Sequence, residues 1–229
     1  MSLKLRALCA SLAVFASAAH AAGANPAVSA LRLYVFDCGT IDVSDISLFS
    51  PGVDKGKKKT LTDSCYLVAH PKGTLVWDTG LPDEIAKEKG GKKLSDAFHA
   101  RLGKPLAQQF RETGFSPDAV TYLGISHMHF DHIGNVSLFP KATLLMQEEE
   151  HEAAFGPDSA KFGNDPKNYP TLAANPATRL AGDHDVFGDG SVVICQDVRV
   201  LVARLEPGAR VVEPLAPGRS ASTASSRRT

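Results

Sequence analysis

The sequence predicts an α/β layered fold in which strands and helices alternate along one chain. Short apolar runs typical of strands alternate with segments of helical period or acidic composition, as expected when helices pack on a sheet. The chain has 229 residues, of which 43% are hydrophobic and 22% charged. This length and composition suit one globular domain with a sizeable core. The formal net charge is zero, so no overall field favours a nucleic-acid partner, and none is expected.

The N-terminal segment has the pattern of a secretory signal. Lys4 and Arg6 precede a mostly apolar run over 7–18, and Ala19-His20-Ala21 supplies the small residues that a signal peptidase reads. The run is too short for a membrane span, and no stop-transfer pattern follows it. Residues 1–21 are therefore expected to be a signal peptide, with a buried N-terminal helix as the alternative. The mature chain would have no membrane span and would be secreted, most plausibly to a bacterial periplasm.

The next part of the chain contains three expected strands. Residues 31–38 are the first, and a lysine-rich stretch at 54–59 indicates a solvated loop or hairpin tip. Residues 64–70 and 73–77 are two further strands joined by a tight turn. Leucines and phenylalanines then recur with helical period across 94–112, which predicts a helix interrupted at Pro105.

Strands and helices continue to alternate up to residue 194. Strands are expected at 120–126 and 142–146, and a short acidic helix at 147–155. A loop follows at 156–176, and a turn precedes a strand at 191–194. The domain is therefore assigned to residues 22–194.

The composition changes from residue 195 onward. Residues 22–194 hold 17 basic and 22 acidic residues, whereas 195–229 hold six arginines, no lysine and three acids. No histidine follows His184. We interpret 195–229 as an atypical low-complexity tail, with disorder expected over 220–229. Residues 198–205 do alternate and are compatible with a strand.

Three cysteines remain once Cys9 is assigned to the signal. Cys38, Cys65 and Cys195 form no Cys-x-x-Cys pair, so a thiolate zinc site is not expected. Cys38 and Cys65 lie in strand-like segments, where buried small hydrophobic side chains are the simplest interpretation. An oxidising compartment also permits a disulfide between them.

Three histidines and an aspartate lie within six residues directly after the strand expected at 120–126. They are His127, His129, Asp131 and His132. Two imidazoles two residues apart in an extended segment can share a metal ion, and a turn can direct the next pair at a second ion. Gly134 would relieve crowding in that turn. One ion would polarise a substrate carbonyl, and a hydroxide held between the ions would attack it. A His-rich surface loop is the alternative, but four candidate ligands in this order are seldom a coincidence.

This HxHxDH pattern resembles that of the metallo-β-lactamase superfamily, which implies an αββα sandwich. The resemblance implies two zinc ions, the first held by His127 and His129 and the second by Asp131 and His132. It also implies a catalytic role for Asp131, which would orient the attacking hydroxide. Asp78, in Trp77-Asp78-Thr79-Gly80, is similar to the family's aspartate that supports the metal ligands. A plain turn aspartate is the alternative for Asp78.

Within the superfamily, the chain most resembles the N-acyl homoserine lactonases. The features that carry this resemblance are Leu33-Tyr34-Val35-Phe36-Asp37-Cys38-Gly39, Ser64-Cys65-Tyr66-Leu67-Val68, Trp77-Asp78-Thr79-Gly80-Leu81 and the segment 182–190. The similarity spans about residues 31–194. It implies hydrolysis of a small-molecule lactone. A secreted metallo-β-lactamase and a non-catalytic remnant remain as alternatives, and the sequence does not determine the oligomeric state.

The ligand set expected for the family is incomplete in this sequence. The family has a third histidine for the first metal, a bridging aspartate and a last histidine, and all are expected at or after residue 195. Two ligands per ion leave each zinc under-coordinated. We therefore expect a sandwich that is incomplete in its C-terminal half, with impaired activity. A slip of the coding frame near Ile194 is our hypothesis, which the other frames of the downstream DNA would test.

Overall fold

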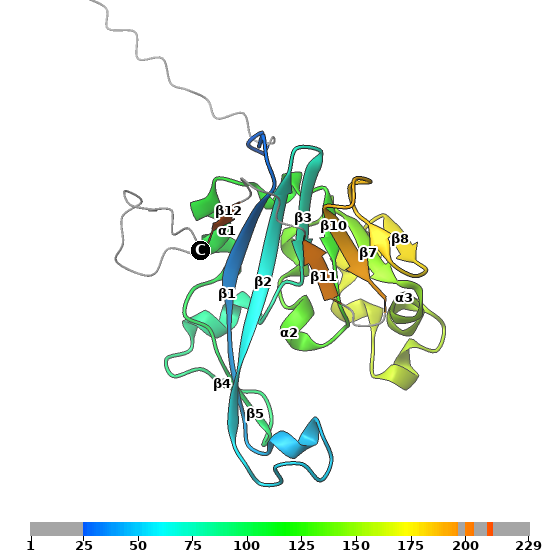
Figure 1. Ribbon diagram of the computed structural model, residues 1–229. Coiled ribbons are helices and arrows are strands. Elements are labelled where there is room, and N and C mark those ends of the chain that lie inside the picture. Colours follow the sequence, from blue (N-terminus) through cyan, green and yellow to red (C-terminus); the bar gives the residue numbers. More distant parts are fainter. Residues whose placement is uncertain (1–24, 197–199, 204–209, 213–229) are drawn as a thin grey trace, which may run out of the picture.

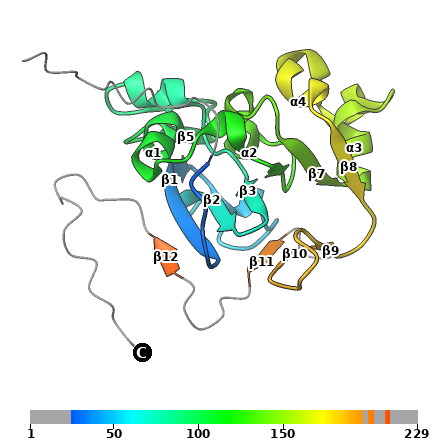
Figure 2. The same cartoon turned by 90° about the horizontal axis from the view of Figure 1, so that it is seen from above.

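Two β-sheets lie face to face, and the helices lie on the outer side of the larger one (Figures 1 and 2). This computed structural model describes residues 25–196, 200–203 and 210–212. The expected α/β layering is therefore confirmed as three layers: helices, a nine-stranded sheet and a three-stranded sheet. In the described part of the chain, no helix follows the smaller sheet.

The larger sheet is mixed, with the strand order β4-β5-β1-β2-β3-β6-β7-β8, and β12 also pairs with β1. Its first half is antiparallel, while β3, β6, β7 and β8 run parallel to one another. The strands are β1 (Arg32–Val43), β2 (Lys59–His70), β3 (Gly73–Trp77), β4 (Lys92–Lys93), β5 (Phe98–Arg101), β6 (Tyr122–Gly124), β7 (Thr143–Gln147), β8 (Ala177–Leu180) and β12 (Arg210–Val212).

The smaller sheet has the order β11-β10-β9. Its strands are β9 (His184–Asp185), β10 (Val192–Cys195) and β11 (Val200–Ala203). The strand expected within 198–205 is confirmed by β11, which pairs antiparallel with β10. The disorder expected over 220–229 and the signal peptide expected over 1–21 lie outside the described residues.

Across the described residues, four α-helices and six short 3-10 helices connect the strands. The α-helices are α1 (Leu106–Thr113), α2 (Phe130–Ile133), α3 (Glu148–Phe155) and α4 (Pro170–Ala174). The 3-10 helices are Ile46–Leu48, Asp83–Lys87, Pro117–Ala119, Val136–Leu138, Ser159–Phe162 and Pro166–Asn168. No helix among the described residues combines the length and the apolar character needed to cross a membrane.

Alternating side chains of the central strands pack on opposite faces of the larger sheet. Val76 and Leu144 contact the helices, in a core that includes Phe110, whereas Leu75 and Leu145 contact the smaller sheet. Strands buried on both faces become nearly continuous apolar runs, which explains why β3 and β7 were predictable from sequence.

Two expectations about the connections are wrong. The helix expected over 94–112 begins only at Leu106, because residues 98–101 form β5 and pair with β1 from Thr40 to Val43. Hydrogen bonding to a sheet edge thus overrides a helical pattern whose apolar positions also suit a strand. The loop expected over 156–176 contains α4 and two 3-10 helices.

Candidate metal centre

The candidate site lies where two parallel strands of the larger sheet end side by side. Trp77 of β3 pairs with Gly124 of β6, so Asp78 and the segment 125–132 leave the sheet at the same edge. The backbone N–H of Asp78 donates to the carbonyl of Gly124 at 2.9 Å. Ligands in α/β folds bind at such carboxyl ends of strands, where loops present their side chains.

Asp78 connects the end of β3 to the histidine cluster. Its carboxylate accepts hydrogen bonds from the backbone N–H of Ser126 at 2.8 Å and from the Ser126 hydroxyl at 2.9 Å. Its Oδ2 also lies 2.8 Å from Nδ1 of His132. Asp78 is buried and has a φ of 55°, a left-handed conformation that aspartate tolerates better than most residues. Asp78 therefore contacts both Ser126 and His132, while its supporting role toward a metal stays a prediction.

The first pair of expected ligands flanks Met128 in the segment that follows β6. Met128 points into the core, so His127 and His129 project to its other side. Nε2 of His127 lies 2.9 Å from Nδ1 of His129. The Ser126 hydroxyl donates to Asp78, so its oxygen can accept a hydrogen bond from Nδ1–H of His127 at 3.1 Å. With that proton on Nδ1, Nε2 of His127 carries the lone pair and faces Nδ1 of His129 as a hydrogen-bond acceptor.

The second pair of expected ligands lies in the short helix α2. Nε2 of His132 is 3.7 Å from Oδ2 of Asp131. Because Nδ1 of His132 faces Asp78, Nε2 is the nitrogen that it can offer to a metal. The ring centroids of His127 and His132 are 4.0 Å apart. All four motif residues are therefore gathered at one place.

The loops that follow Asp78 and His132 are fastened to each other. The backbone N–H and the hydroxyl of Thr79 both donate to the carbonyl of His132, at 2.7 and 2.9 Å. The side-chain amide of Asn135 donates to the carbonyls of Thr79 and Leu81, at 2.7 and 2.8 Å. Gly134 has a right-handed backbone conformation, with φ at −58°. A Cβ at Gly134 would overlap the backbone of 80–82, so its crowding arises from this neighbouring loop rather than from its own turn.

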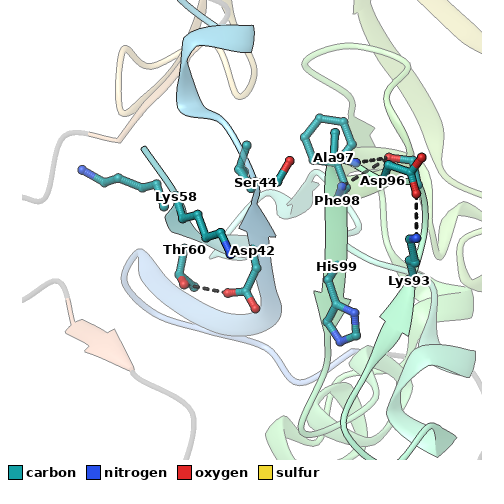
Figure 3. Close-up of a pocket in the computed structure, with 12 residues that line it drawn as sticks. Asp42, Ser44, Lys58, Thr60, Lys93, Asp96, Ala97, Phe98 and His99 are labelled. Carbon is teal, nitrogen blue, oxygen red and sulfur yellow. Dashed lines mark hydrogen bonds and ion pairs between the residues drawn. The ribbon is translucent and has the colours of Figure 1, made fainter. Parts of the chain in front are cut away.

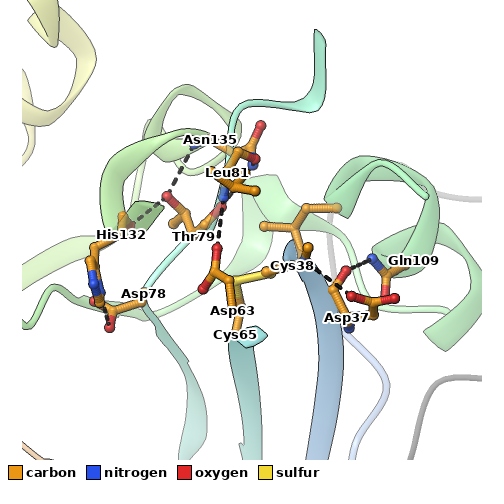
Figure 4. The surroundings of a disulfide bond; sticks show 12 residues. Asp37, Cys38, Asp63, Cys65, Asp78, Thr79, Leu81, Gln109, His132 and Asn135 are labelled. Carbon is orange, nitrogen blue, oxygen red and sulfur yellow. Dashed lines mark hydrogen bonds and ion pairs between the residues drawn. A yellow bond between two sulfur atoms is a disulfide. The ribbon is translucent and has the colours of Figure 1, made fainter. Parts of the chain in front are cut away.

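A disulfide between Cys38 and Cys65 lies beneath the same loop (Figure 4). It joins β1 to β2, which resolves the two interpretations left open for these cysteines. Gly80 packs directly on both sulfur atoms, and its φ of 65° favours glycine. Asp63, two residues before Cys65, accepts a hydrogen bond from the backbone N–H of Leu81 at 3.0 Å.

The charges of the site are unevenly distributed. Burial, with His132 and His129 nearby, lowers the pKa of His127 to about 4, so its imidazole is neutral at pH 7. Burial opposes the charged form of His132, but the Asp78 hydrogen bond and the nearby carboxylates raise its pKa overall. Burial and the negative charge of Asp131 raise the pKa of Asp63 to about 7. The carboxyl groups of Asp63, Asp78 and Asp131 interact electrostatically. Their ionised forms generate a negative field that favours cations.

The donor atoms fit metal ions as two incomplete pairs. Two nitrogens that ligate one zinc in a tetrahedral site are roughly 3.3 Å apart, close to the separation between His127 and His129. Ser126 and Asp78 contact the Nδ1 atoms of His127 and His132. The Nε2 atoms of these two rings therefore carry the lone pairs that face the site. Among the described residues, however, no group of three or more His, Cys, Asp or Glu side chains is arranged to hold an ion. The cluster thus offers at most two donor groups to each of two ions.

The remaining histidines lie in other parts of the fold. His70 and His151 are buried, each only 9% exposed. His70 stacks on Phe187, and His151 packs against Phe155. His99 is partly exposed, with its ring near the carbonyl of Gly90. His184 lies in β9 opposite Ile194.

Several supporting residues were not identified from the sequence. They are Ser126, Thr79, Asn135, Asp63 and Glu150. The carboxylate of Glu150 accepts from the backbone N–H of Met128 at 3.0 Å and so holds the segment between two ligands. Ser126 adjoins the motif and was a possible candidate. Asp63 and Glu150 carry no local signal, since they reach the site only through the sheet and α3.

Comparison with known proteins places the whole region in one family. Residues 61–197 match the family model described as the metallo-beta-lactamase superfamily, a span that includes all four motif residues. The chain is 31% identical over 170 residues to the N-acyl homoserine lactonase AttM of Agrobacterium fabrum and to that of Rhizobium johnstonii. These alignments cover 71% of this chain and 64% of each relative. The chain therefore spans just under two thirds of the length of these relatives.

The chain is also similar to a more distant lactonase and to a solved structure. The N-acyl homoserine lactonase AiiA of Bacillus thuringiensis is 27% identical over 128 residues, covering 54% of this chain and 51% of its own. A solved N-acyl homoserine lactone hydrolase, with N-hexanoyl-L-homoserine at its catalytic metal center, superposes with a TM-score of 0.57 at 24% identity. It covers 71% of this chain and 64% of that chain, and it supports the fold.

Proposed function

The chain belongs to the metallo-beta-lactamase superfamily, and on that premise we propose that it is a zinc-dependent hydrolase that opens the ring of an N-acyl homoserine lactone. The observation that carries this proposal is the convergence of His127, His129, Asp131 and His132 at one strand edge, with their donor atoms facing one another. The lactone substrate is supported by the curated lactonase relatives.

In this proposal His127 and His129 would bind one zinc ion, and Asp131 and His132 would bind a second. Ions bound there would polarise a carbonyl and lower the pKa of water. The protein's own groups prepare the site. Ser126 and Asp78 fix the ring orientations of His127 and His132. Asp131 offers a half-exposed carboxylate that can orient an attacking water, and the neutral state of His127 keeps a lone pair available.

Export belongs to the same proposal. The N-terminal pattern predicts cleavage after Ala21, and the Cys38–Cys65 disulfide suits an oxidising compartment such as the periplasm. Mass spectrometry of the protein recovered from a periplasmic fraction should give a chain that starts at Ala22. A chain that stays in the cytoplasm and retains Met1 contradicts export.

The activity is tested by supplying zinc and following ring opening of an N-acyl homoserine lactone and of a β-lactam in parallel. We expect slow turnover of the lactone, because each ion would have only two of its protein ligands, and loss of that turnover in the His127→Ala and Asp131→Asn variants. Turnover of the β-lactam alone would assign the chain to the alternative activity. Elemental analysis adds an independent readout: a protein that retains no zinc and turns over neither compound is a non-catalytic remnant.

A further inference from the structure

The connection between β1 and β2 presents apolar side chains to solvent. Leu48, Phe49 and Val53 are exposed over 56%, 59% and 59% of their surface. They lie at the end of the long β1–β2 ladder that projects away from α3 and β8 (Figure 1). The Phe49 ring contacts Phe98 of β5, with 6.3 Å between centroids, which holds the segment against the sheet. Exposed apolar groups gathered at one projecting end mark an interaction surface.

Unpaired lysines lie in the same connection. Residues 45–59 contain four lysines, at 55, 57, 58 and 59, and two acids, Asp45 and Asp54. Asp45 accepts a hydrogen bond from the backbone N–H of Ser47, and Asp54 pairs with Lys57 at 2.7 Å. Lys55, Lys58 and Lys59 form no ion pair within the part of the chain that the structure describes. The β1–β2 connection therefore presents an excess of positive charge beside its exposed apolar side chains.

A pocket of about 450 Å³ opens beside this end, between the last residues of β1, the first of β2 and β5 (Figure 3). Its acidic residues already have partners. Asp42 accepts from the Thr60 hydroxyl at 2.6 Å and pairs with Arg101, while Asp96 pairs with Lys93. Lys58 and Lys59 line the same pocket without a carboxylate partner. The unmatched charge of the pocket is thus positive, which suits an anionic group such as a phosphate diester.

We propose that the end formed by residues 46–59 binds the surface of an anionic phospholipid bilayer. The exposed apolar side chains would enter the boundary between headgroups and acyl chains, and the unpaired lysines would contact headgroup phosphates. A second copy of the chain is a poorer occupant, because symmetric contact would place lysines against lysines. The zero net charge of the whole chain does not oppose binding, since charges more than about 8 Å away are largely screened at physiological ionic strength.

The test is co-sedimentation of the full chain with vesicles of phosphatidylglycerol and phosphatidylcholine, compared with phosphatidylcholine alone. We expect binding to the anionic vesicles only. The partition coefficient should fall roughly tenfold or more in Lys55→Glu/Lys58→Glu and by a similar factor in Phe49→Ser. Phe162→Ser is the matched control, because Phe162 is 66% exposed beside Lys161 but lies in another region. All variants carry the same N-terminal residues, so a difference between them reports on this end alone.

A second measurement locates the contact. Trp77 is buried, so Phe49→Trp adds an exposed reporter, and Phe162→Trp provides its control. Brominated lipids should quench the added fluorescence of Phe49→Trp but not that of Phe162→Trp. Equal binding by the Phe49→Ser and Phe162→Ser variants overturns the proposal. So does lipid-independent self-association that Phe49→Ser abolishes, since it would identify a second copy as the occupant.

Discussion

At the scale of single residues, Asp78 determines which nitrogen His132 presents to the site. The carboxylate accepts from Ser126 through both oxygens and faces Nδ1 of His132. The same Ser126 hydroxyl oxygen is available to Nδ1 of His127. One buried aspartate thus controls the orientation of one expected ligand directly and of another through a serine.

Replacing Asp78 with Asn should weaken zinc binding by about 10- to 100-fold, because the carboxylate that orients His132 is lost. Titration of the zinc-loaded protein with a competing chelator measures the change. Asp118→Asn, at an exposed position in the 3-10 helix before β6, is the control and should retain the original affinity. Unchanged zinc affinity in Asp78→Asn would show that Asp78 is only a turn residue.

Asp189 connects the larger sheet to the loop that precedes β10 of the smaller sheet. It accepts from the Ser191 hydroxyl at 2.6 Å, pairs with Lys72 at 3.1 Å and lies 3.2 Å from Nε2 of His70. The Ser191 and Lys72 hydrogen bonds hold the pKa of Asp189 well below its usual range. These contacts join the β2–β3 turn to the loop before β10.

The contribution of Asp189 to stability should depend on pH. Since its pKa is lower in the folded than in the unfolded chain, the stabilisation is present above about pH 4 and is lost as the pH falls further. In urea unfolding, Asp189→Asn should be less stable than the original protein at pH 7, and the difference should shrink towards pH 2. Glu149→Gln is the control, and a difference independent of pH contradicts the assignment.

At the scale of elements, the site consists of two loops that stabilise each other. Residues 78–81 and 132–135 share hydrogen bonds through Thr79 and Asn135, and their backbones meet at Gly80 and Gly134. Neither loop belongs to a long regular element. Their mutual contacts therefore replace the support that a helix or a sheet would otherwise provide.

Gly134→Ala tests this contact. The new Cβ would overlap the carbonyl oxygen of Gly80 and the backbone nitrogen of Pro82, neither of which can rotate away. We expect a loss of about 1–3 kcal/mol in the free energy of unfolding. Gly103→Ala is the matched control, because a Cβ there meets nothing within 4 Å. Equal stability of the two variants in denaturant titrations would show that the loops move apart at little cost.

At the scale of the whole molecule, the Cys38–Cys65 disulfide connects the sheet to the site. The cysteines are 27 residues apart in sequence, on either side of the projecting β1–β2 connection. Closing such a loop covalently restricts the unfolded chain, which stabilises the fold. The bond also contacts Gly80, so it supports the loop that carries Asp78.

Removal of the disulfide by Cys38→Ser/Cys65→Ser should lower the free energy of unfolding by about 3–4 kcal/mol. Chemical denaturation under oxidising conditions measures the effect. Cys195→Ser should change stability little, because Cys195 forms no disulfide. Addition of a reductant should destabilise the original protein and leave the double variant unchanged. A double variant as stable as the original would show that the bond forms without constraining the chain.

The sequence by itself determined the features that depend on neighbouring residues. The buried runs of β3 and β7, the turn after β2, the acidic helix α3 and the cluster at 127–132 all result from local periodicity or spacing. These signals are local because burial on a strand or a helix follows the chain's own repeat. The four candidate ligands could be named from this spacing, and the family from the resemblance of the motif.

Only the tertiary structure decided which distant segments meet. It placed Asp78 against His132, Glu150 against Met128 and Cys38 against Cys65, and it made a strand of residues 98–101. In each case the partners are separated along the chain, and local spacing does not show that they meet, although the family resemblance suggested a role for Asp78 and an oxidising compartment permitted the disulfide. Such contacts depend on strand order and register, which set the distances between side chains and which local periodicity does not encode.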